Sequence, residues 1–363
     1  MEISYYIVRM PLKNPFTTSF GTDIYRESII FRLSENGITA YSECVSDHDP
    51  FYSYEDNTTA MHIISEYLIK SVKNLPEPEE FLKSVSYIKG HNMAKAALEM
   101  LLYDYHARLN KKSLADYLGQ NRGYAIPGIS IGIDKIDKML ERIDEAVKMG
   151  YNRIKVKIKK GLENEILKSI RDVYPDISLS ADANSDYTFN DIELLKSLDR
   201  YNLVYIEQPL CYDDLIYHSK LSREISTPIC LDESITSSRR AEKAFEIGAC
   251  SVINIKPGRV SGLTESIKIA RIAMENNGHA WVGGMLETGI GRAYNMALAA
   301  NNLIDYPGDT SPNARYYSED LVKNPFTMDN GIISIDLKRP GTGIDVDSNA
   351  LKKYTIDSGK FEI

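Results

Sequence analysis

Five residues with ionisable side chains recur along the chain at almost constant spacing. They are Lys157, Asp182, Glu207, Asp232 and Lys256, and successive members are 25, 25, 25 and 24 residues apart. Each lies near the end of a short apolar run that is typical of a buried β-strand. A barrel of alternating strands and helices would bring all of these strand ends to one rim. Three carboxylates and two amines at one rim would suit a metal-assisted transfer of protons.

The three acids indicate a bound cation. Carboxylates at neighbouring strand ends repel one another, so Asp182, Glu207 and Asp232 would be stable together only around a positive charge. A site of oxygen ligands, without histidine or cysteine, favours a hard ion, Mg²⁺ first and Mn²⁺ second. The alternative is that each acid only caps the helix after its strand, which is common for one acid but explains three in succession poorly.

The two lysines predict acid–base chemistry. Residues alternate between the two faces of a strand, so in RIKVKIK the side chain of Lys157 shares a face with that of Lys155. Two amines close together and near a divalent cation disfavour full protonation of both, and one can then act as a general base near neutral pH. Lys256, on the far side of the metal, would be a second base or a cation that stabilises negative charge.

The composition is that of an ordinary globular protein and argues against several classes of function. The 363 residues are 43% hydrophobic and 26% charged, and a net charge of −8 argues against a nucleic-acid-binding surface. The four cysteines form no CxxC pair, so no zinc or redox motif is indicated. The chain shows no signal peptide and no apolar run of about 18 residues, so we expect a cytoplasmic protein without a membrane anchor.

The order of the predicted elements indicates two units. Strand-like segments at 4–10 and 28–34 precede helical patterns at 54–71 and 91–110, which suggests a separate α+β unit. Strands and helices then alternate through seven repeats, and a short segment at 303–306 could supply an eighth strand. Charged residues at five consecutive strand ends favour a closed barrel over an open doubly wound sheet, and no GxGxxG motif follows the first strand.

We therefore predict an α/β fold with a (β/α)7β modified TIM barrel at residues 121–323. An α+β capping domain would occupy residues 1–120. The C-terminal segment, residues 324–363, would return to the capping domain.

Several motifs resemble those of the enolase superfamily. They are KVK at 155–157, DAN at 182–184, IEQP at 206–209, PICLDES at 228–234, INIKPGR at 253–259 and GGMLETGIGRA at 283–293. The resemblance is closest to the muconate lactonising subgroup, and within it to the o-succinylbenzoate synthase and N-acylamino acid racemase family. It also reaches the amino end, where PFTTSFGT at 15–22 and FYSY at 51–54 resemble lid segments.

The resemblance implies a role for each residue. Asp182, Glu207 and Asp232 would bind Mg²⁺, while Lys157 and Lys256 would face each other across a small carboxylate substrate as the acid–base pair. The supporting residues would be Lys155, Asn184, Glu233 and Arg259, and Arg259 matches an arginine that accompanies racemase ability in this family. The resemblance also implies a homo-oligomer.

Four further residues are candidates for contact with the substrate. They are Phe20 in the lid loop, Ser130 at the end of the first barrel strand, and Gly284 and Met285 in the turn after the seventh strand. The alternative for the last three is ordinary turn chemistry.

The reaction that the resemblance implies starts with removal of a proton next to a carboxylate whose charge the metal stabilises. With a hydroxyl on the β-carbon, the enzyme would be a dehydratase, an o-succinylbenzoate synthase acting on 2-succinyl-6-hydroxy-2,4-cyclohexadiene-1-carboxylate in menaquinone biosynthesis. Without a leaving group, the opposite lysine would return a proton to the other face and racemise an N-acylamino acid. The alternatives are a dedicated N-succinylamino acid racemase, a dipeptide epimerase, a muconate cycloisomerase and a catalytically silent binding module.

Overall fold

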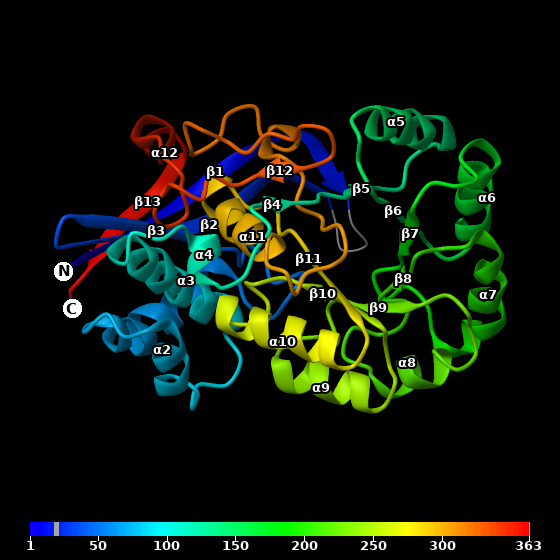
Figure 1. The fold of residues 1–363 in the computed structure, drawn as a ribbon, viewed down its shortest axis with the longest axis horizontal. Coiled ribbons are helices and arrows are strands. Elements are labelled where there is room, and N and C mark those ends of the chain that lie inside the picture. The colour runs from blue at the N-terminus through cyan, green and yellow to red at the C-terminus, as the bar shows by residue number, and fades with distance from the viewer. Residues whose placement is uncertain (18–21, 363) are drawn as a thin grey trace.

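The computed structural model describes residues 1–17 and 22–362 and contains two main sheets. The first is antiparallel, with the strand order β13-β1-β2-β3, and it lies at the left of Figure 1 where the two ends of the chain meet. Its strands are β1 (Glu2–Thr17), β2 (Thr22–Glu35), β3 (Ile38–Cys44) and β13 (Thr355–Phe361). β1 and β2 are longer than the predicted strands at 4–10 and 28–34, because their pairing continues out to Thr17 and Thr22.

Four helices complete the capping unit, and two of them, the first and the third, contact this sheet. They are α1 (Asn57–Ile63), α2 (Pro78–Ser84), α3 (Asn92–Leu109) and α4 (Leu114–Tyr117), and α1 continues as a π-helical segment (Ile64–Leu68) and a 3₁₀ segment (Ile69–Val72). The single helix predicted at 54–71 is therefore three helical segments. α3 contacts the sheet, where the Ser42 hydroxyl donates to the Ala97 carbonyl at 2.7 Å. Most residues of α3 are buried, which explains why its sequence is apolar on more than one side.

The second main sheet is parallel, and its seven strands follow one another in chain order, which confirms the predicted barrel. The strands are β5 (Ile129–Ile131), β6 (Ile154–Lys157), β7 (Leu179–Asp182), β8 (Ile206–Glu207), β9 (Ile229–Leu231), β10 (Val252–Ile255) and β11 (His279–Val282). Because all of them run in one direction, their carboxyl ends form one rim.

Helices surround these strands on the outside, as Figure 1 shows. They are α5 (Ile136–Lys148), α6 (Glu163–Val173), α7 (Ile192–Ser197), α8 (Ile216–Leu221), α9 (Ser238–Glu246), α10 (Leu263–Glu275) and α11 (Gly289–Ala299). Short 3₁₀ segments lie at Phe189–Asp191, Leu198–Tyr201 and Asn313–Arg315. Within the described ranges, no helix combines the length and the apolar character needed to cross a membrane.

An irregular segment closes the barrel. The predicted eighth strand at 303–306 is not a regular strand, but its Asp305 N–H donates to the Ala280 carbonyl of β11 at 3.2 Å. On the other side, Gly308 exchanges two backbone hydrogen bonds with residues 126–128, which lead into β5. This segment therefore bridges the last and first barrel strands without forming a full ladder with either.

The chain after the barrel leads back to the first sheet. β12 (Ile333–Ser334) pairs with β4 (Tyr124–Ala125), and α12 (Ser348–Tyr354) precedes β13. β13 then pairs with β1, from Ile3 opposite Phe361 to Val8 opposite Thr355. From this pairing we propose the division of the chain into a capping unit of residues 1–120 and 324–363 and a barrel of residues 121–323.

Two buried glutamates join the capping unit to helices of the barrel. Glu99 on α3 accepts hydrogen bonds from the backbone N–H groups of Leu263 (2.9 Å) and Thr264 (2.8 Å) at the start of α10. Glu43 on β3 accepts in the same way from the first turn of α11. Helix N-termini carry unpaired N–H groups and a partial positive charge, so these carboxylates fix both helices relative to the capping unit.

The Glu99 contact should make stability depend on pH. Burial raises the pKa of Glu99 to about 7, although the hydrogen bonds from Thr264 and Leu263 oppose this shift. A carboxyl group with a raised folded-state pKa stabilises the fold at low pH and loses this contribution as the pH rises through that value. We therefore expect the stability of the wild-type protein, relative to Glu99→Gln, to fall by about 1–3 kcal/mol between pH 5 and pH 8.

Calorimetric or circular-dichroism melting at several pH values would measure this difference. Glu242→Gln, at an exposed position of α9, is the matched control and should show no such trend. A difference between the wild type and Glu99→Gln that stays constant with pH would contradict the prediction.

Candidate active site

The strand register places the predicted residues side by side at the barrel rim. Lys157 of β6 lies opposite Asp182 of β7, and Asp182 lies opposite Glu207 of β8. Lys157 Nζ is 3.5 Å from Asp182 Oδ2, and Lys155 Nζ is 3.2 Å from the same oxygen. The two lysines of KVK therefore reach one carboxylate, as their shared strand face predicts.

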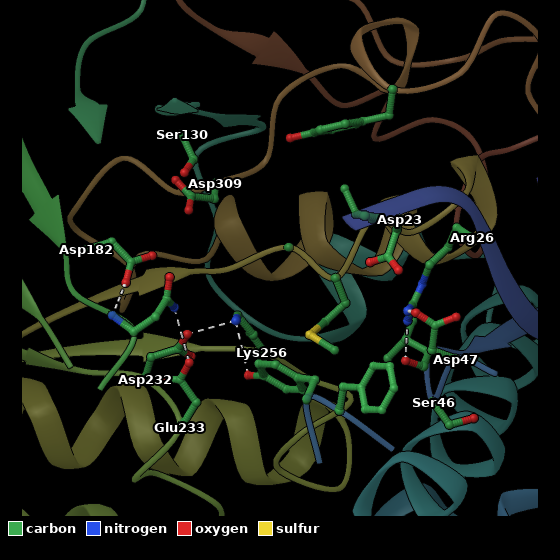
Figure 2. A pocket seen from close by; sticks show the side chains of 18 of the residues that line it. Asp23, Arg26, Ser46, Asp47, Ser130, Asp182, Asp232, Glu233, Lys256 and Asp309 are labelled. Atoms are coloured by element: carbon green, nitrogen blue, oxygen red, sulfur yellow. Dashed lines mark hydrogen bonds and ion pairs between the residues drawn. The ribbon is translucent and has the colours of Figure 1, made fainter. Parts of the chain in front are cut away.

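Lys256 enters the site from the other side. It directly follows β10, and β10 and β6 are four positions apart in the barrel, so Lys256 and Lys157 extend from opposite walls. Lys256 Nζ lies 2.8 Å from Asp232 Oδ2, and the guanidinium of Arg259 pairs with Asp232 Oδ1. In Figure 2, Lys256 lies beside Asp232, and Asp182 lies farther from it. The rim carboxylates thus lie between the two lysines.

The charges at the rim shift the pKa values of the carboxyl groups in opposite directions. Burial, together with repulsion from Asp182 and Asp232, raises the pKa of Glu207 to about 8. Burial and the charge of Asp232 likewise raise the pKa of Glu233 to about 7. For Asp232, basic neighbours led by Lys256 outweigh burial and lower the pKa to about 2. The carboxylates are therefore close enough to repel one another strongly.

Lys155 is a buried, fixed cation. Its Nζ lies 2.8 Å from Glu207 Oε2 and 2.7 Å from Asp309 Oδ2, in addition to its contact with Asp182. Burial opposes its charge, but these carboxylates, Asp309 first, raise its pKa well above the usual range. Lys155 therefore stays protonated. Lys155 and Lys157 contact the same carboxylate oxygen of Asp182, and the role of Lys155 in tuning Lys157 stays a prediction.

Asn184 and Glu233, two of the predicted supporting residues, also lie in the site. The Asn184 side-chain oxygen accepts a hydrogen bond from Lys157 Nζ. The amide nitrogen of the same side chain donates to Glu233 Oε1 at 3.4 Å. The backbone N–H of Asn184 donates to Asp182 Oδ1 at 3.1 Å, so this residue connects a lysine with two of the acids.

Three further residues of the site carry little signal in the sequence. Asp309, which also pairs with Arg153 at 2.7 Å, follows the irregular closing segment, so no strand pattern marks it. Asn254 donates to Glu207 Oε1 at 2.9 Å, and its place on the inward face of INIK could have indicated it. The Tyr52 hydroxyl lies 3.1 Å from the Lys256 ammonium, but a lid-like segment does not show which of its residues points inward.

A cavity of about 170 Å³ lies between the barrel rim and the capping unit. Ser130, Gly284 and Met285 line it, while Phe20 lies outside the described residues. Figure 2 shows Asp23, Arg26 and Asp47 on the far side from Asp182 and Asp232. The buried guanidinium of Arg26 pairs with Asp47 there. The cavity therefore has charged groups at both ends, which suits a substrate with more than one polar group.

The rim has the donor set of a divalent-cation site. Asp182, Glu207 and Asp232 offer only oxygen ligands, and a cation would relieve the repulsion that raises the pKa of Glu207. As the side chains stand in the part of the chain that the structure describes, no three acidic, histidine or cysteine residues converge on one metal position. Instead, the ammonium groups of Lys155 and Lys256 form ion pairs with the oxygens of these three carboxylates. The residues fit a metal by type and place, and its binding would replace some of these ion pairs.

Two family models match the chain. One, for the mandelate racemase / muconate lactonizing enzyme N-terminal domain, matches residues 2–119, and the other, for the enolase C-terminal domain-like family, matches residues 138–350. The chain therefore belongs to the mandelate racemase and muconate lactonizing enzyme family of the enolase superfamily. Membership of this superfamily suggests that the site uses a divalent metal.

Individual relatives are similar to this chain over nearly its full length. The chain is 42% identical over 363 residues to an o-succinylbenzoate synthase of Bacillus subtilis, and the match covers 99% of this chain and 98% of that protein. It is 40% identical over 343 residues to an N-succinylamino acid racemase of Thermus thermophilus, covering 94% and 92%. A solved structure of an enolase superfamily member from Listeria innocua has a TM-score of 0.95 at 37% identity, covering 99% and 98%.

We expect Mg²⁺ to stabilise the folded protein, because a ligand that binds only the folded state raises the unfolding midpoint as its concentration increases. Glu207→Gln should weaken Mg²⁺ binding by more than about tenfold, since losing even an outer-shell partner can cost that much. Thermal melting against MgCl₂ concentration, together with titration calorimetry, would measure both effects.

Asp176→Asn provides the control, because Asp176 is an exposed acid just before β7 at the opposite end of the barrel. It should keep the wild-type response to Mg²⁺. The metal assignment would be wrong if Glu207→Gln responded to Mg²⁺ as strongly as the wild type.

Proposed function

We propose that the protein is a Mg²⁺-dependent o-succinylbenzoate synthase that also racemises N-succinylamino acids. The observation that carries this proposal is the pair of lysines, Lys157 and Lys256, on opposite walls of one cavity with the carboxylates of Asp182 and Asp232 between them. Full-length relatives with these two activities in their names support it. Mg²⁺ is preferred to Mn²⁺ because the donor set is entirely oxygen.

In this proposal the chain's own residues move the protons. The substrate carboxylate lies near Asp182, Glu207 and Asp232, where Mg²⁺ supplies charge stabilisation as the α-proton leaves. Lys157, as the neutral amine, takes the α-proton from one face of the substrate. Lys155, which stays protonated, contacts the same oxygen of Asp182 as Lys157 does.

Two outcomes can follow the loss of the proton. If a hydroxyl is present on the β-carbon, the electrons of the broken C–H bond form a carbon–carbon double bond and the C–O bond breaks. The hydroxyl takes up the proton that Lys157 removed and leaves as water, which returns Lys157 to the neutral amine. If no leaving group is present, Lys256 donates a proton to the opposite face and inverts the α-carbon. One pair of lysines can therefore serve a dehydration and a racemisation.

A dedicated N-succinylamino acid racemase is the second candidate. Dehydration requires only one base, whereas racemisation uses two. The side chains that contact Lys256 hold it in place as fully as those that contact Lys157. Lys256 contacts Asp232 and Tyr52, and Arg259 holds Asp232 from the other side. Relatives named N-succinylamino acid racemase, from Thermus thermophilus and Amycolatopsis, are each 40% identical to this chain.

The setting of the enzyme is also part of the proposal. The cysteines, Cys44, Cys211, Cys230 and Cys250, are all unpaired, which suits the reducing cytoplasm. We further propose a homo-oligomer, on the resemblance to the family.

Replacement of either lysine should stop racemisation. Lys157→Ala and Lys256→Ala are each expected to lower the racemisation rate by about 10²–10⁴-fold, because each lysine serves as acid or base on one face. Polarimetry of N-succinylamino acids would follow racemisation, and ultraviolet absorbance would follow dehydration of the cyclohexadiene substrate. Removal of divalent metal with EDTA should abolish both reactions, and Mg²⁺ should restore them.

Lys159→Ala removes an exposed lysine two residues beyond Lys157 and should leave both rates unchanged. The proposal would be overturned if the wild-type protein with Mg²⁺ neither exchanged the α-proton of N-succinylamino acids in deuterated water nor dehydrated the cyclohexadiene. Exchange without dehydration would favour the dedicated racemase.

A further inference from the structure

Different parts of the fold hold the two lysines in place. Lys157 contacts Asp182 and Asn184, and both of these residues belong to the barrel. Lys256 contacts Asp232 of the barrel but also Tyr52, which lies in the loop of residues 45–56 between β3 and α1 of the capping unit. Among residues 1–17 and 22–362, a side chain from a loop that covers the cavity contacts Lys256, and none is found in contact with Lys157.

Tyr52 is turned into the site. Its hydroxyl lies 3.1 Å from Lys256 Nζ and 3.0 Å from Arg259 Nη1, and the ammonium of Lys256 lies 4.7 Å from the centre of its ring. Its loop neighbours Phe51 and Tyr54 are 63% and 61% exposed. The loop thus directs one of its aromatic side chains toward the basic wall. In Figure 2, a dashed line marks the contact of Lys256 with Asp232.

These contacts restrict where the lysine can point. A lysine side chain loses considerable rotamer freedom when it is ordered, and its ammonium group has three N–H donors. Asp232 accepts one donor and the Tyr52 hydroxyl accepts a second, which leaves the third for the cavity that Lys256 lines. With only Asp232 as a partner, the amine could swing about that single contact.

The chemistry of a hydroxyl suits a group that both gives and takes protons. A phenol can accept a hydrogen bond from an ammonium group and donate one to a neutral amine, whereas a carboxylate can only accept and a guanidinium can only donate. A neutral lysine amine keeps two N–H donors, so it can keep its contact with Asp232 and, at the same time, accept a hydrogen bond from the Tyr52 hydroxyl at its lone pair. Tyr52 can therefore orient Lys256 on either side of a proton transfer.

We propose that Tyr52 is the positioning residue for Lys256, so that proton transfer on the Lys256 face of the substrate depends on the loop of residues 45–56. Transfer on the Lys157 face would depend on the barrel residues Asp182 and Asn184, which hold Lys157 among the described residues. This inference rests on the proposed function, because it assumes that both lysines exchange protons with the α-carbon. It makes the loop a determinant of racemisation, which uses both faces.

Tyr52→Phe tests the proposal, because it keeps the ring and removes only the hydroxyl. The readout is the initial rate of α-proton exchange in deuterated water, followed by proton NMR, for each enantiomer of an N-succinylamino acid at saturating concentration with Mg²⁺. The enantiomer that still exchanges in Lys256→Ala is the one whose proton faces Lys157. In Tyr52→Phe we expect exchange of the other enantiomer to slow by at least about tenfold, as loss of a hydrogen bond to a charged group would produce. Exchange of the Lys157-facing enantiomer should stay within about twofold of the wild type.

Tyr54→Phe removes a hydroxyl from the same loop without touching either lysine and should leave both exchange rates at the wild-type level. Equal slowing of both enantiomers in Tyr52→Phe would overturn the inference, since it would show a general effect on substrate binding or loop closure. No slowing of either enantiomer would overturn it as well. Absence of exchange for both enantiomers in the wild-type protein would instead refute the proposed racemase function, and this inference with it.

Discussion

Mutual compensation of buried charge is the interaction on which the barrel rim depends. An ionised group removed from water costs several kcal/mol unless an opposite charge and good hydrogen bonds replace its hydration. At this rim, Lys155 alone contacts the carboxylates of Asp182, Glu207 and Asp309, and Asp232 is held between Lys256 and Arg259. The charges of Lys155, Asp232 and Asp309 are stabilised by their charged neighbours, whereas burial and repulsion raise the pKa of Glu207 to about 8. A doubly negative substrate and a divalent cation could enter together without changing the net charge of this network.

The same constraint explains why the site lies between two units of the fold. The barrel supplies charged groups from consecutive strand ends, but it leaves them open on one side. The capping unit covers this opening with Tyr52, Arg26 and Asp47, and its Glu43 and Glu99 fix it to the starts of α11 and α10. These contacts use backbone N–H groups that every helix start provides. The capping unit therefore has a defined position over the rim. The sequences of its loops can change without loss of the contacts that Glu43 and Glu99 make.

Much of this arrangement could be predicted from the sequence, because the barrel is regular. The constant spacing of Lys157, Asp182 and the three residues that follow reflects one strand and one helix per repeat, and alternation within KVK places both lysines on one face. Elsewhere the regularity fails. Asp309 follows the irregular closing segment, the helix predicted at 54–71 changes type along its length, and the inward turn of Tyr52 is set by tertiary contacts of a loop. The family resemblance supplied the supporting roles of Asn184 and Glu233, which spacing alone does not indicate.

The pairing of β1 with β13 has a consequence for the biosynthesis of the protein. β1 is made long before β13, and one of its two edges stays unpaired until the segment at 355–361 has been synthesised. Contacts between such distant parts of a chain form slowly, and an open strand edge invites pairing with other chains. The barrel could therefore fold on the ribosome before the sheet of the capping unit is completed by β13. Premature termination near the carboxyl end would then yield an aggregation-prone polypeptide with a folded barrel and an incomplete sheet.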